Sequence, residues 1–420
     1  MPSLTVTGGV TLSGALRVPG AKNAALPILA AALLSKEPLW LFDCPKLRDV
    51  HNMLEILTTM GCQFRWEGDN TLWIDPSGAQ SHEMPEHLSK QLRSSIFMLG
   101  PLLGRFGQAV ATFPGGCEIG LRPIDLHLKA LSALNVRIRE EYGLIHCDGR
   151  DMKGGIIHLD YPSVGATENA MMAAVNALGE TLIHNAAREP EIEDLQRFLR
   201  MLGFRVQGAG SHTISIDGGK RGATKTLEHR VLPDRIVAGT YLCAGAITGG
   251  DIMLTNVLPG HLGSVLDKLG ECGCEITLGQ GELRLIGPQR PKELTLVETQ
   301  PYPGFPTDMQ AQLFALCTVA QGASVIVENV FENRFKHAAE MMRMGATCTI
   351  KGRTAVIRGV PRLTGATVDA HDLRGGAALV LAGLRAQGQT IVRGAELIDR
   401  GYEAFETNLA QLGANIGRLP

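Results

Sequence analysis

A glycine-rich segment with a single cysteine is the sharpest chemical feature of the sequence. It reads Pro114-Gly-Gly-Cys117-Glu-Ile-Gly-Leu-Arg122 and precedes Pro123, a residue type that often opens a helix. Glycines allow such a loop to move, and a thiol beside positive charge can donate a proton or act as a nucleophile. Cys117 is therefore a candidate for acid or nucleophilic chemistry. An inert buried cysteine is the ordinary alternative.

Lys22, Asn23 and Asp308 are polar residues placed where apolar helices are expected to begin. Lys22 and Asn23 precede an apolar run that reaches Leu34, and their ammonium and amide groups can bind an anion; a capped helix with an exposed lysine is the alternative. Asp308 can act as a general base, with a helix N-cap as its ordinary role. Both segments are candidate parts of a site for a charged ligand.

Three arginines, Arg122, Arg334 and Arg400, recur near the starts of predicted amphipathic helices. The start of a helix carries partial positive charge, so a cation there opposes the dipole and capping does not explain it. The arginines therefore indicate an anionic substrate. Solvated faces or salt bridges between repeats are the alternative explanation.

The elements that must position these residues form a repeat. Six times, a helix-like run ends at Gly or Asn and is followed by an alternation of polar and apolar residues, with a spacing of roughly 70 residues. The glycine or asparagine should take the left-handed conformation that ends a helix. These marker residues are Gly61, Asn135, Gly203, Gly273, Gly345 and Gly413.

Each repeat reads β-α-β-α-β-β, and its first helix is apolar over most of its length. The apolar runs are 25–34, 96–103, 170–178, 236–247, 309–319 and 377–384. Polar residues stand where these helices should begin: Lys22-Asn23, Arg93, Thr167-Glu168, Asp234-Arg235, Asp308 and Arg374. Because apolar helices must be buried against neighbours, we predict an α/β fold of six units arranged as two groups of three around two cores.

Length, composition and charge agree with a two-domain protein that binds a small molecule. At 420 residues and 45.0 kDa the chain exceeds the roughly 250–300 residues of a single core, and its 45% of hydrophobic residues disfavours disorder. A net charge of -2 without a basic block disfavours nucleic-acid and membrane partners.

Cysteine usage and the N-terminal residues predict a cytoplasmic protein. Nine scattered cysteines do not suggest a disulfide framework. No basic segment leads into an apolar stretch at the N-terminus, and residues 24–34 are too few to cross a bilayer. Pro85 interrupts the zinc-like pattern of His82, Glu83 and His87, so no metal is expected there. No Walker A or Rossmann glycine motif occurs, so the sequence does not support a dinucleotide or P-loop mechanism.

Seven segments, in order along nearly the whole chain, resemble the UDP-N-acetylglucosamine 1-carboxyvinyltransferases, a family of enolpyruvyl transferases. They are residues 21–27, 114–127, 163–169, 188–192, 304–312, 331–335 and 399–403. The resemblance implies an inverse α/β barrel with one domain over 22–229 and a second over 1–21 and 230–420. It also implies that the N-terminal strand joins the C-terminal half, with the active site in the cleft between the domains.

The resemblance further implies the reaction and its partners. The enolpyruvyl group of phosphoenolpyruvate would move to the sugar 3-hydroxyl of UDP-N-acetylglucosamine, with release of phosphate through a tetrahedral intermediate. This step begins peptidoglycan precursor synthesis. No metal, organic cofactor, nucleic acid or membrane is implied.

The resemblance also assigns roles to residues. Cys117 would protonate the enol methylene carbon, react with fosfomycin-like epoxides and lie on a movable lid, and Asp308 would take the proton of the sugar hydroxyl. Lys22, Arg122 and Arg400 would hold phosphate or carboxylate charge, with Asn23, Arg334 and Arg374 near them. The residues that match UDP-sugar positions are Arg93, Arg122, Pro123, Ile124, Asp125, Leu126, Ser163, Val164 and Val330.

Two residues depart from the commonest pattern of that family. Glu118 follows Cys117 where a small residue is usual, and Val237 stands where Glu is frequent. A carboxylate next to the thiol disfavours the thiolate, and a changed motion of the lid is the alternative effect of Glu118; we expect Glu118→Ala to shift the pH profile of thiol alkylation. An unchanged profile would contradict this expectation.

Two other functions are considered. The sister transferase of the shikimate pathway shares the architecture, but the cysteine loop and the segment Ser163-Val-Gly-Ala-Thr argue against it. A non-enzymatic repeat scaffold gives no reason for Lys, Cys, Asp and Arg to recur at loops and helix starts.

Overall fold

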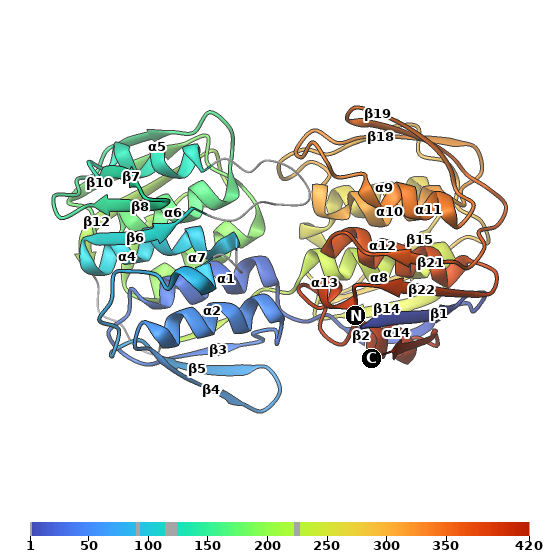
Figure 1. The fold of residues 1–420 in the computed structure, drawn as a ribbon, viewed down its shortest axis with the longest axis horizontal. Helices are drawn as coiled ribbons and strands as arrows, with labels where there is room; N and C mark the ends of the chain where they lie inside the picture. The colour runs from blue at the N-terminus through green and yellow to red at the C-terminus, as the bar shows by residue number, and fades with distance from the viewer. Residues whose placement is uncertain (1, 90–92, 114–123, 222–226, 420) are drawn as a thin grey trace. The chain divides into compact units, whose positions relative to one another are not determined.

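The chain forms two compact units, each with its own hydrophobic core (Figure 1). The computed structural model describes residues 2–89, 93–113, 124–221 and 227–419. We call the described residues from 20 to 232 the N-unit, and those up to 19 together with those from 233 onward the C-unit. The N-unit is thus inserted, in chain order, between the second strand of the C-unit and its first helix.

The N-unit contains three sheets in its described residues, with strand orders β13-β3-β5-β4, β6-β8-β7 and β11-β12-β10-β9. The strands are β3 (Leu39–Phe42), β4 (Gln63–Glu67), β5 (Thr71–Asp75), β6 (Gln108–Thr112), β7 (Arg137–Glu141), β8 (Leu144–Asp148), β9 (Ile156–His158), β10 (Gly179–His184), β11 (Phe204–Gln207), β12 (Thr213–Arg221) and β13 (Glu228–Arg230). The helices are α1 (Lys22–Ala32), α2 (Arg48–Thr59), α3 (Glu86–Ser89), η1 (Arg93–Met98), α4 (Leu99–Phe106), α5 (Asp125–Ala133), α6 (Val164–Ala174) and α7 (Pro190–Met201).

The C-unit contains three more sheets in its described residues, with orders β15-β16-β14-β2, β17-β18-β20-β19 and β21-β22-β1-β23. The strands are β1 (Ser3–Thr7), β2 (Ser13–Arg17), β14 (Asp251–Thr255), β15 (Glu275–Leu278), β16 (Glu282–Ile286), β17 (Val297–Glu298), β18 (Ala323–Val327), β19 (Thr347–Lys351), β20 (Thr354–Arg358), β21 (Thr367–Asp369), β22 (Gln389–Arg393) and β23 (Asn415–Leu419). The helices are α8 (Arg235–Thr248), η2 (Pro259–His261), α9 (Gly263–Glu271), η3 (Thr307–Met309), α10 (Gln310–Cys317), α11 (Lys336–Arg343), α12 (Leu373–Arg385), α13 (Ala395–Ile398) and α14 (Phe405–Gln411).

The six described sheets correspond to the six predicted repeats. Each four-stranded sheet combines one parallel strand pair with antiparallel neighbours, as a β-α-β crossover followed by two further strands requires. All six marker residues have positive φ, from 65° at Asn135 to 106° at Gly61, which confirms that each ends a helix in the left-handed conformation.

The first helices of the repeats are buried inside each unit, and the sheets lie around them (Figure 1). In the C-unit, α8, α10 and α12 contact one another, and α8 is buried from Ile236 to Thr248. Such helices are apolar on all sides because neighbours surround them. This arrangement, helices inside and sheets outside, is the predicted inverse α/β barrel, and in the C-unit it brings the start of α12 next to η3, where Arg374 contacts Asp308.

One predicted helix start is wrong, and two others lie beside the predicted residues, Arg93 and Asp308, but begin with a 3₁₀ turn. The run 96–103 is divided between η1 and α4, and the run 309–319 between η3 and α10, so each begins with a tighter 3₁₀ turn. The third helix begins at Val164, with Ser163 as its N-cap, so Thr167 and Glu168 lie inside α6 rather than at its start.

Candidate active site

In the C-unit, the carboxylate of Asp308 is held between two buried arginines. Its Oδ1 accepts a hydrogen bond from Arg334 Nη2 at 2.8 Å, and its Oδ2 accepts one from Arg374 Nη2 at 3.2 Å. The side chains of Arg334 and Arg374 are only 3% and 2% exposed, whereas that of Asp308 is 27% exposed. A partly accessible carboxylate is thereby fixed in one orientation by two cations that solvent screens poorly.

Three different elements supply these residues. Asp308 lies in η3, Arg334 precedes α11, and Arg374 is the second residue of α12. Asp372 is the N-cap of α12 and accepts hydrogen bonds from the backbone N–H groups of Arg374 and Gly375, both at 2.9 Å. The N-cap positions of η3 and α10 belong to Pro306 and Met309, so Asp308 caps neither helix.

Both arginines retain donors that no described residue satisfies. For Arg334 and for Arg374, the Nε and Nη1 atoms are buried and have no hydrogen-bond partner within the described chain. Buried charged donors are costly unless they are paired, so these four nitrogens are suited to an anionic ligand with several acceptor oxygens. The arginines expected near phosphate or carboxylate charge therefore have the chemistry of an anion site.

Burial and neighbouring charge shift the pKa values of two groups at this site. Burial alone would lower the pKa of the Arg374 guanidinium, but Tyr402, Asp308 and Asp234 outweigh it, and the pKa is raised. Burial lowers the pKa of His337 to about 4, with Asp372 opposing and Arg334 supporting the shift. Arg374 is therefore a permanent cation, and His337 is neutral at pH 7.

Sequence reasoning missed Glu328, which organises the segment beside Asp308. This carboxylate is 1% exposed and accepts hydrogen bonds from Thr307 Oγ1 at 2.9 Å and from the backbone N–H groups of Val330 and Phe331 at 2.9 and 3.1 Å. Glu328 thus links the backbone of Val330, which is expected at the UDP-sugar, to Thr307, the residue that precedes Asp308. The local signal was an acidic residue directly after a β-rich stretch.

In the N-unit, Lys22 and Asn23 open α1 as predicted. The Lys22 ammonium lies 3.5 Å from Asp49 Oδ2 in the first turn of α2, and the two side chains are 13% and 4% exposed. The chain passes very close to Asp43 just before this point, and a Cβ at Gly20 would overlap the Asp43 carbonyl oxygen. Glycine is therefore required for the approach to the α1 start.

Other expected UDP-sugar residues of the N-unit also lie at helix starts. Ser163 Oγ accepts a hydrogen bond from Ala166 N at 3.3 Å, and Val164 is the first residue of α6. Ile124 occupies the N-cap position of α5, and Asp125 and Leu126 are its first two residues. Helix starts that present N–H groups are suited to anionic ligands.

The remaining expected residues fall outside this description or need correction. Cys117, Glu118, Arg122 and Pro123 lie outside the described residues, as does the side chain of Arg93. Arg400 does not open a helix, because α13 ends at Ile398 and α14 begins at Phe405. It lies in the turn between them, two residues before Tyr402.

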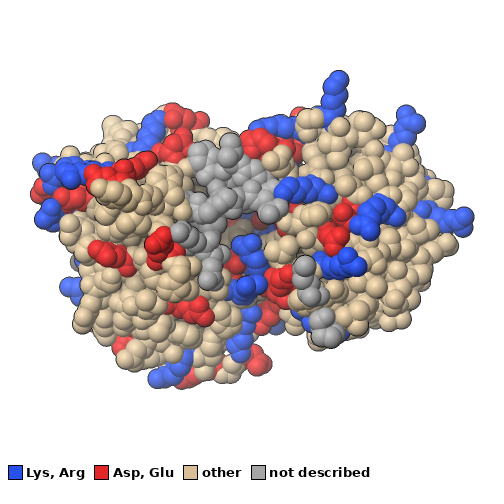
Figure 2. Space-filling model, viewed as in Figure 1, with Lys and Arg blue, Asp and Glu red and all other residues tan. Residues whose placement is uncertain are grey.

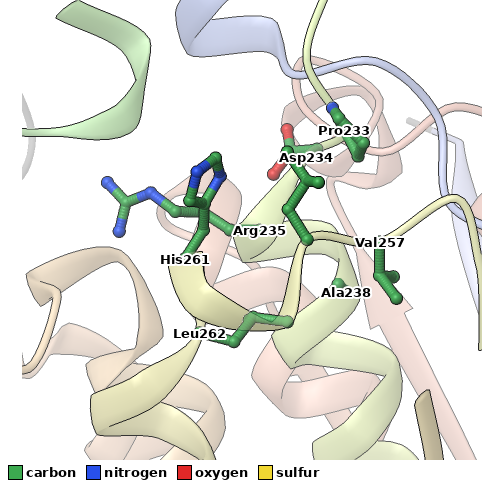
Figure 3. A pocket seen from close by; sticks show the side chains of 8 residues that line it. Pro233, Asp234, Arg235, Ala238, Val257, His261 and Leu262 are labelled. Carbon is green, nitrogen blue, oxygen red and sulfur yellow. The ribbon is translucent and has the colours of Figure 1, made fainter. Parts of the chain in front are cut away.

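A small hollow at the start of α8 is lined by none of the three residues Asp308, Arg334 and Arg374. Its lining includes Asp234, Arg235 and His261, whose side chains Figure 3 shows beside the helix start. Asp234 is occupied as the N-cap, accepting from Ile236 N at 2.8 Å and Val237 N at 2.9 Å. The capping role therefore explains the carboxylate in this hollow, whose lining contains none of the expected site residues.

Surface charge and the described helices add two observations. Figure 2 shows basic and acidic side chains interspersed on the visible face, without a continuous basic stripe in the part that is described. None of the described helices has both the length and the apolar character that a bilayer crossing requires. Among the described residues, no three His, Cys, Asp or Glu side chains gather as a metal site would need.

Comparison with known proteins gives full-length matches. The family model of EPSP synthase (3-phosphoshikimate 1-carboxyvinyltransferase) matches residues 6–409. UDP-N-acetylglucosamine 1-carboxyvinyltransferase 2 of Caldanaerobacter subterraneus is 49% identical over 419 residues, which is 100% of both chains. The UDP-N-acetylglucosamine 1-carboxyvinyltransferase of Myxococcus xanthus is 48% identical over 100% of this chain and 99% of its own.

Solved structures match over the same length. The enolpyruvyl transferase NikO from Streptomyces tendae is 26% identical with a TM-score of 0.89, covering 99% of this chain and 98% of its own. EPSP synthase from Acinetobacter baumannii is 20% identical with a TM-score of 0.76, covering 100% of both chains. The second likeness concerns the fold alone.

Proposed function

Because this chain belongs to the EPSP synthase family, whose model matches residues 6–409, we propose that it transfers the enolpyruvyl group of phosphoenolpyruvate to the 3-hydroxyl of UDP-N-acetylglucosamine. The C–O bond to phosphate breaks, a C–O bond to the sugar forms, and inorganic phosphate leaves. The UDP-sugar is the acceptor because relatives of that name are 48–51% identical to nearly the whole chain. The product begins peptidoglycan precursor synthesis in the cytoplasm.

The geometry that supports this proposal best is Asp308 between Arg334 and Arg374. A general base must reach the attacking hydroxyl, and the partly exposed carboxylate is available for that proton. The unfilled Nε and Nη1 donors of the two arginines can hold phosphate or carboxylate charge as the tetrahedral intermediate forms and collapses. One site therefore offers both the base and the anion clamp that the reaction needs.

The other expected residues keep their roles in the proposal. Cys117 protonates the methylene carbon from its lid loop, and that carbon loses a proton again when phosphate is eliminated. Lys22, Arg122 and Arg400 hold substrate charge with Asn23, and the UDP-sugar binds Arg93, residues 122–126, Ser163, Val164 and Val330. We also propose residues 22–229, and 1–21 with 230–420, as the two domains.

Phosphate release tests the assignment. Purified protein is incubated with phosphoenolpyruvate and either UDP-N-acetylglucosamine, shikimate 3-phosphate or no acceptor, and the assay is repeated with Cys117→Ala. We expect release that depends on the UDP-sugar and is lost in the variant. Release with the shikimate compound instead would assign the sister reaction, and release with neither would refute the proposal.

A further inference from the structure

The hydroxyl of Tyr402 joins three segments of the C-unit at a buried point. Tyr402 is 1% exposed, and its hydroxyl oxygen lies 2.9 Å from Thr240 Oγ1 in α8 and 3.2 Å from Gln312 Nε2 in α10. Gln312 Nε2 also donates to Thr240 Oγ1 at 3.0 Å and to the Asp308 carbonyl oxygen at 2.9 Å. The network therefore holds the main chain of Asp308 as well as the tyrosine.

Counting protons fixes the direction of these hydrogen bonds. A threonine hydroxyl has one proton, and that of Thr240 is donated to the Ile236 carbonyl oxygen at 2.8 Å. Thr240 Oγ1 must therefore accept from the Tyr402 hydroxyl. With its own proton committed in this way, the tyrosine oxygen presents lone pairs to its remaining neighbours.

The guanidinium of Arg374 lies over the ring of the same tyrosine. Its Cζ lies 5.2 Å from the centroid of the Tyr402 ring, and its Nη2 binds Asp308 Oδ2 at 3.2 Å. Arg374 is thus confined between the tyrosine and the aspartate, leaving Nε and Nη1 unfilled within the described chain. A cation that is 2% exposed is oriented by the groups that surround it, and the face of the Tyr402 ring is one of them.

We propose that Tyr402 is a positioning residue: its hydroxyl holds Gln312 and through it the main chain of Asp308, whose carboxylate binds Arg374, so that base and anion donors keep a fixed spacing. The proposal rests on the proposed function for its catalytic consequence. Preorganised groups accelerate a reaction only while their positions are held, and a small misplacement is costly. Tyr402 itself needs no contact with substrate.

The test compares Tyr402→Phe with Tyr241→Phe. Tyr241 is a matched control because it is also 1% exposed, and Tyr241→Phe loses one partly buried hydrogen bond, that from Asn408 Nδ2 at 3.0 Å, which does not involve Arg374. We expect similar falls in unfolding midpoint for both variants. Only Tyr402→Phe should lower kcat, by about 10- to 100-fold, because it removes the hydroxyl that holds Gln312 and so Asp308 in position.

A second readout does not depend on turnover. Inorganic phosphate should raise the unfolding midpoint of the wild-type chain and of Tyr241→Phe, while Tyr402→Phe should need about tenfold more phosphate for the same rise. Thr240→Val should behave like Tyr402→Phe, and Thr240→Ser, which keeps the acceptor, should restore wild-type behaviour. Equal kcat and equal phosphate response in Tyr402→Phe and Tyr241→Phe would overturn the positioning role.

The two readouts separate the two proposals. If the wild-type chain fails to release phosphate from phosphoenolpyruvate, the proposed function falls, but a phosphate response lost only in Tyr402→Phe still supports the positioning role. If the wild-type chain is active and Tyr402→Phe matches the control in both assays, the positioning role falls and the function stands.

Discussion

At the scale of single residues, the Asp308 site concentrates buried charge in few atoms. Arg334 and Arg374 are nearly inaccessible, and in the described chain the carboxylate of Asp308 is the acidic group that both contact. Two neighbouring guanidinium groups would repel each other without an anion between them. Asp308 therefore serves the structure of the site as well as its proposed chemistry.

Replacing Asp308 with Asn tests the chemical role. The variant keeps the shape of the side chain but cannot take a proton from a hydroxyl, so we expect kcat to fall by about 100- to 10,000-fold. Steady-state phosphate release measures this. Asp251→Asn is the control, because Asp251 also binds an arginine, Arg284, at 2.8 and 2.6 Å, but its side chain is 46% exposed. A fall of equal size in both variants would contradict the role of Asp308.

Glu168 makes a second residue-scale prediction, concerning pH. This side chain is 1% exposed, and neither carboxylate oxygen has a hydrogen-bond partner in the described chain. Burial, with Glu191 and Glu189 nearby, raises the pKa of Glu168 well above its ordinary value. The native state therefore keeps a proton that the unfolded state releases above its ordinary pKa, and this costs stability as pH rises.

Glu168→Gln removes that cost because the amide does not ionise. We expect the unfolding free energy of the variant, relative to wild type, to increase from pH 5 to pH 8, which urea unfolding at both values measures. The effect of His337 on stability has the opposite sign, since its lowered pKa costs stability as pH falls. Because His337 is present in both proteins, its contribution cancels in the difference between them. A difference independent of pH would refute the protonated state of Glu168.

At the scale of elements, Arg418 of β23 anchors the segment that carries Arg400. Its guanidinium binds both oxygens of Asp399 at 2.9 and 2.6 Å and both oxygens of Glu406 at 2.7 and 3.1 Å. Asp399 adjoins Arg400, and Glu406 lies in the first turn of α14. The turn between α13 and α14 is thus fixed by a strand that follows it in the chain.

We predict that Arg418→Ala lowers kcat/KM for phosphoenolpyruvate by roughly 10-fold, because a loosened turn misplaces Arg400. Arg150→Ala is the matched control: Arg150 of the N-unit makes two hydrogen bonds with Asp148, at 2.9 and 2.7 Å, and neither is an expected site residue. Steady-state kinetics with both variants provide the measurement. Unchanged kcat/KM in Arg418→Ala would show that this clamp does not position Arg400.

The elements also show what sequence patterns can predict. The markers from Gly61 to Gly413 and the apolar helices were predictable because helix ends and apolar runs are local signals. The network of Tyr402, Thr240 and Gln312 was not, because its members are 72 to 162 residues apart in the sequence. The same holds for the ion pair of Asp308 with Arg374, 66 residues away, although both residues were expected at the site from family resemblance.

At the scale of the whole molecule, the two units have separate cores. Leu29 is fully buried in the core of the N-unit, and Leu379 is fully buried in that of the C-unit. The chain passes between the units near residues 19 and 232, so each core is built from residues of its own unit. Damage to one core should therefore act first on its own unit.

Leu29→Ala and Leu379→Ala test this independence. Each substitution should cost about 2–5 kcal/mol in the unit that contains it. Hydrogen exchange followed by mass spectrometry should show faster exchange within residues 20–232 for the first variant and within the C-unit for the second. Equal acceleration in both units for either variant would show that they unfold as one cooperative body.

The position of β1 in its sheet has a consequence for biosynthesis. The strand lies between β22 and β23, so Thr5 is paired with Ile391 on one side and with Gly417 on the other. At about 5–20 residues per second, a ribosome needs roughly 20–80 s to make these partners after β1 has appeared. The inserted N-unit has all its residues long before then. Leu4 and Val6 of the nascent chain therefore lack their sheet partners while the whole N-unit is made. During this interval of translation they are exposed to chaperones and proteases.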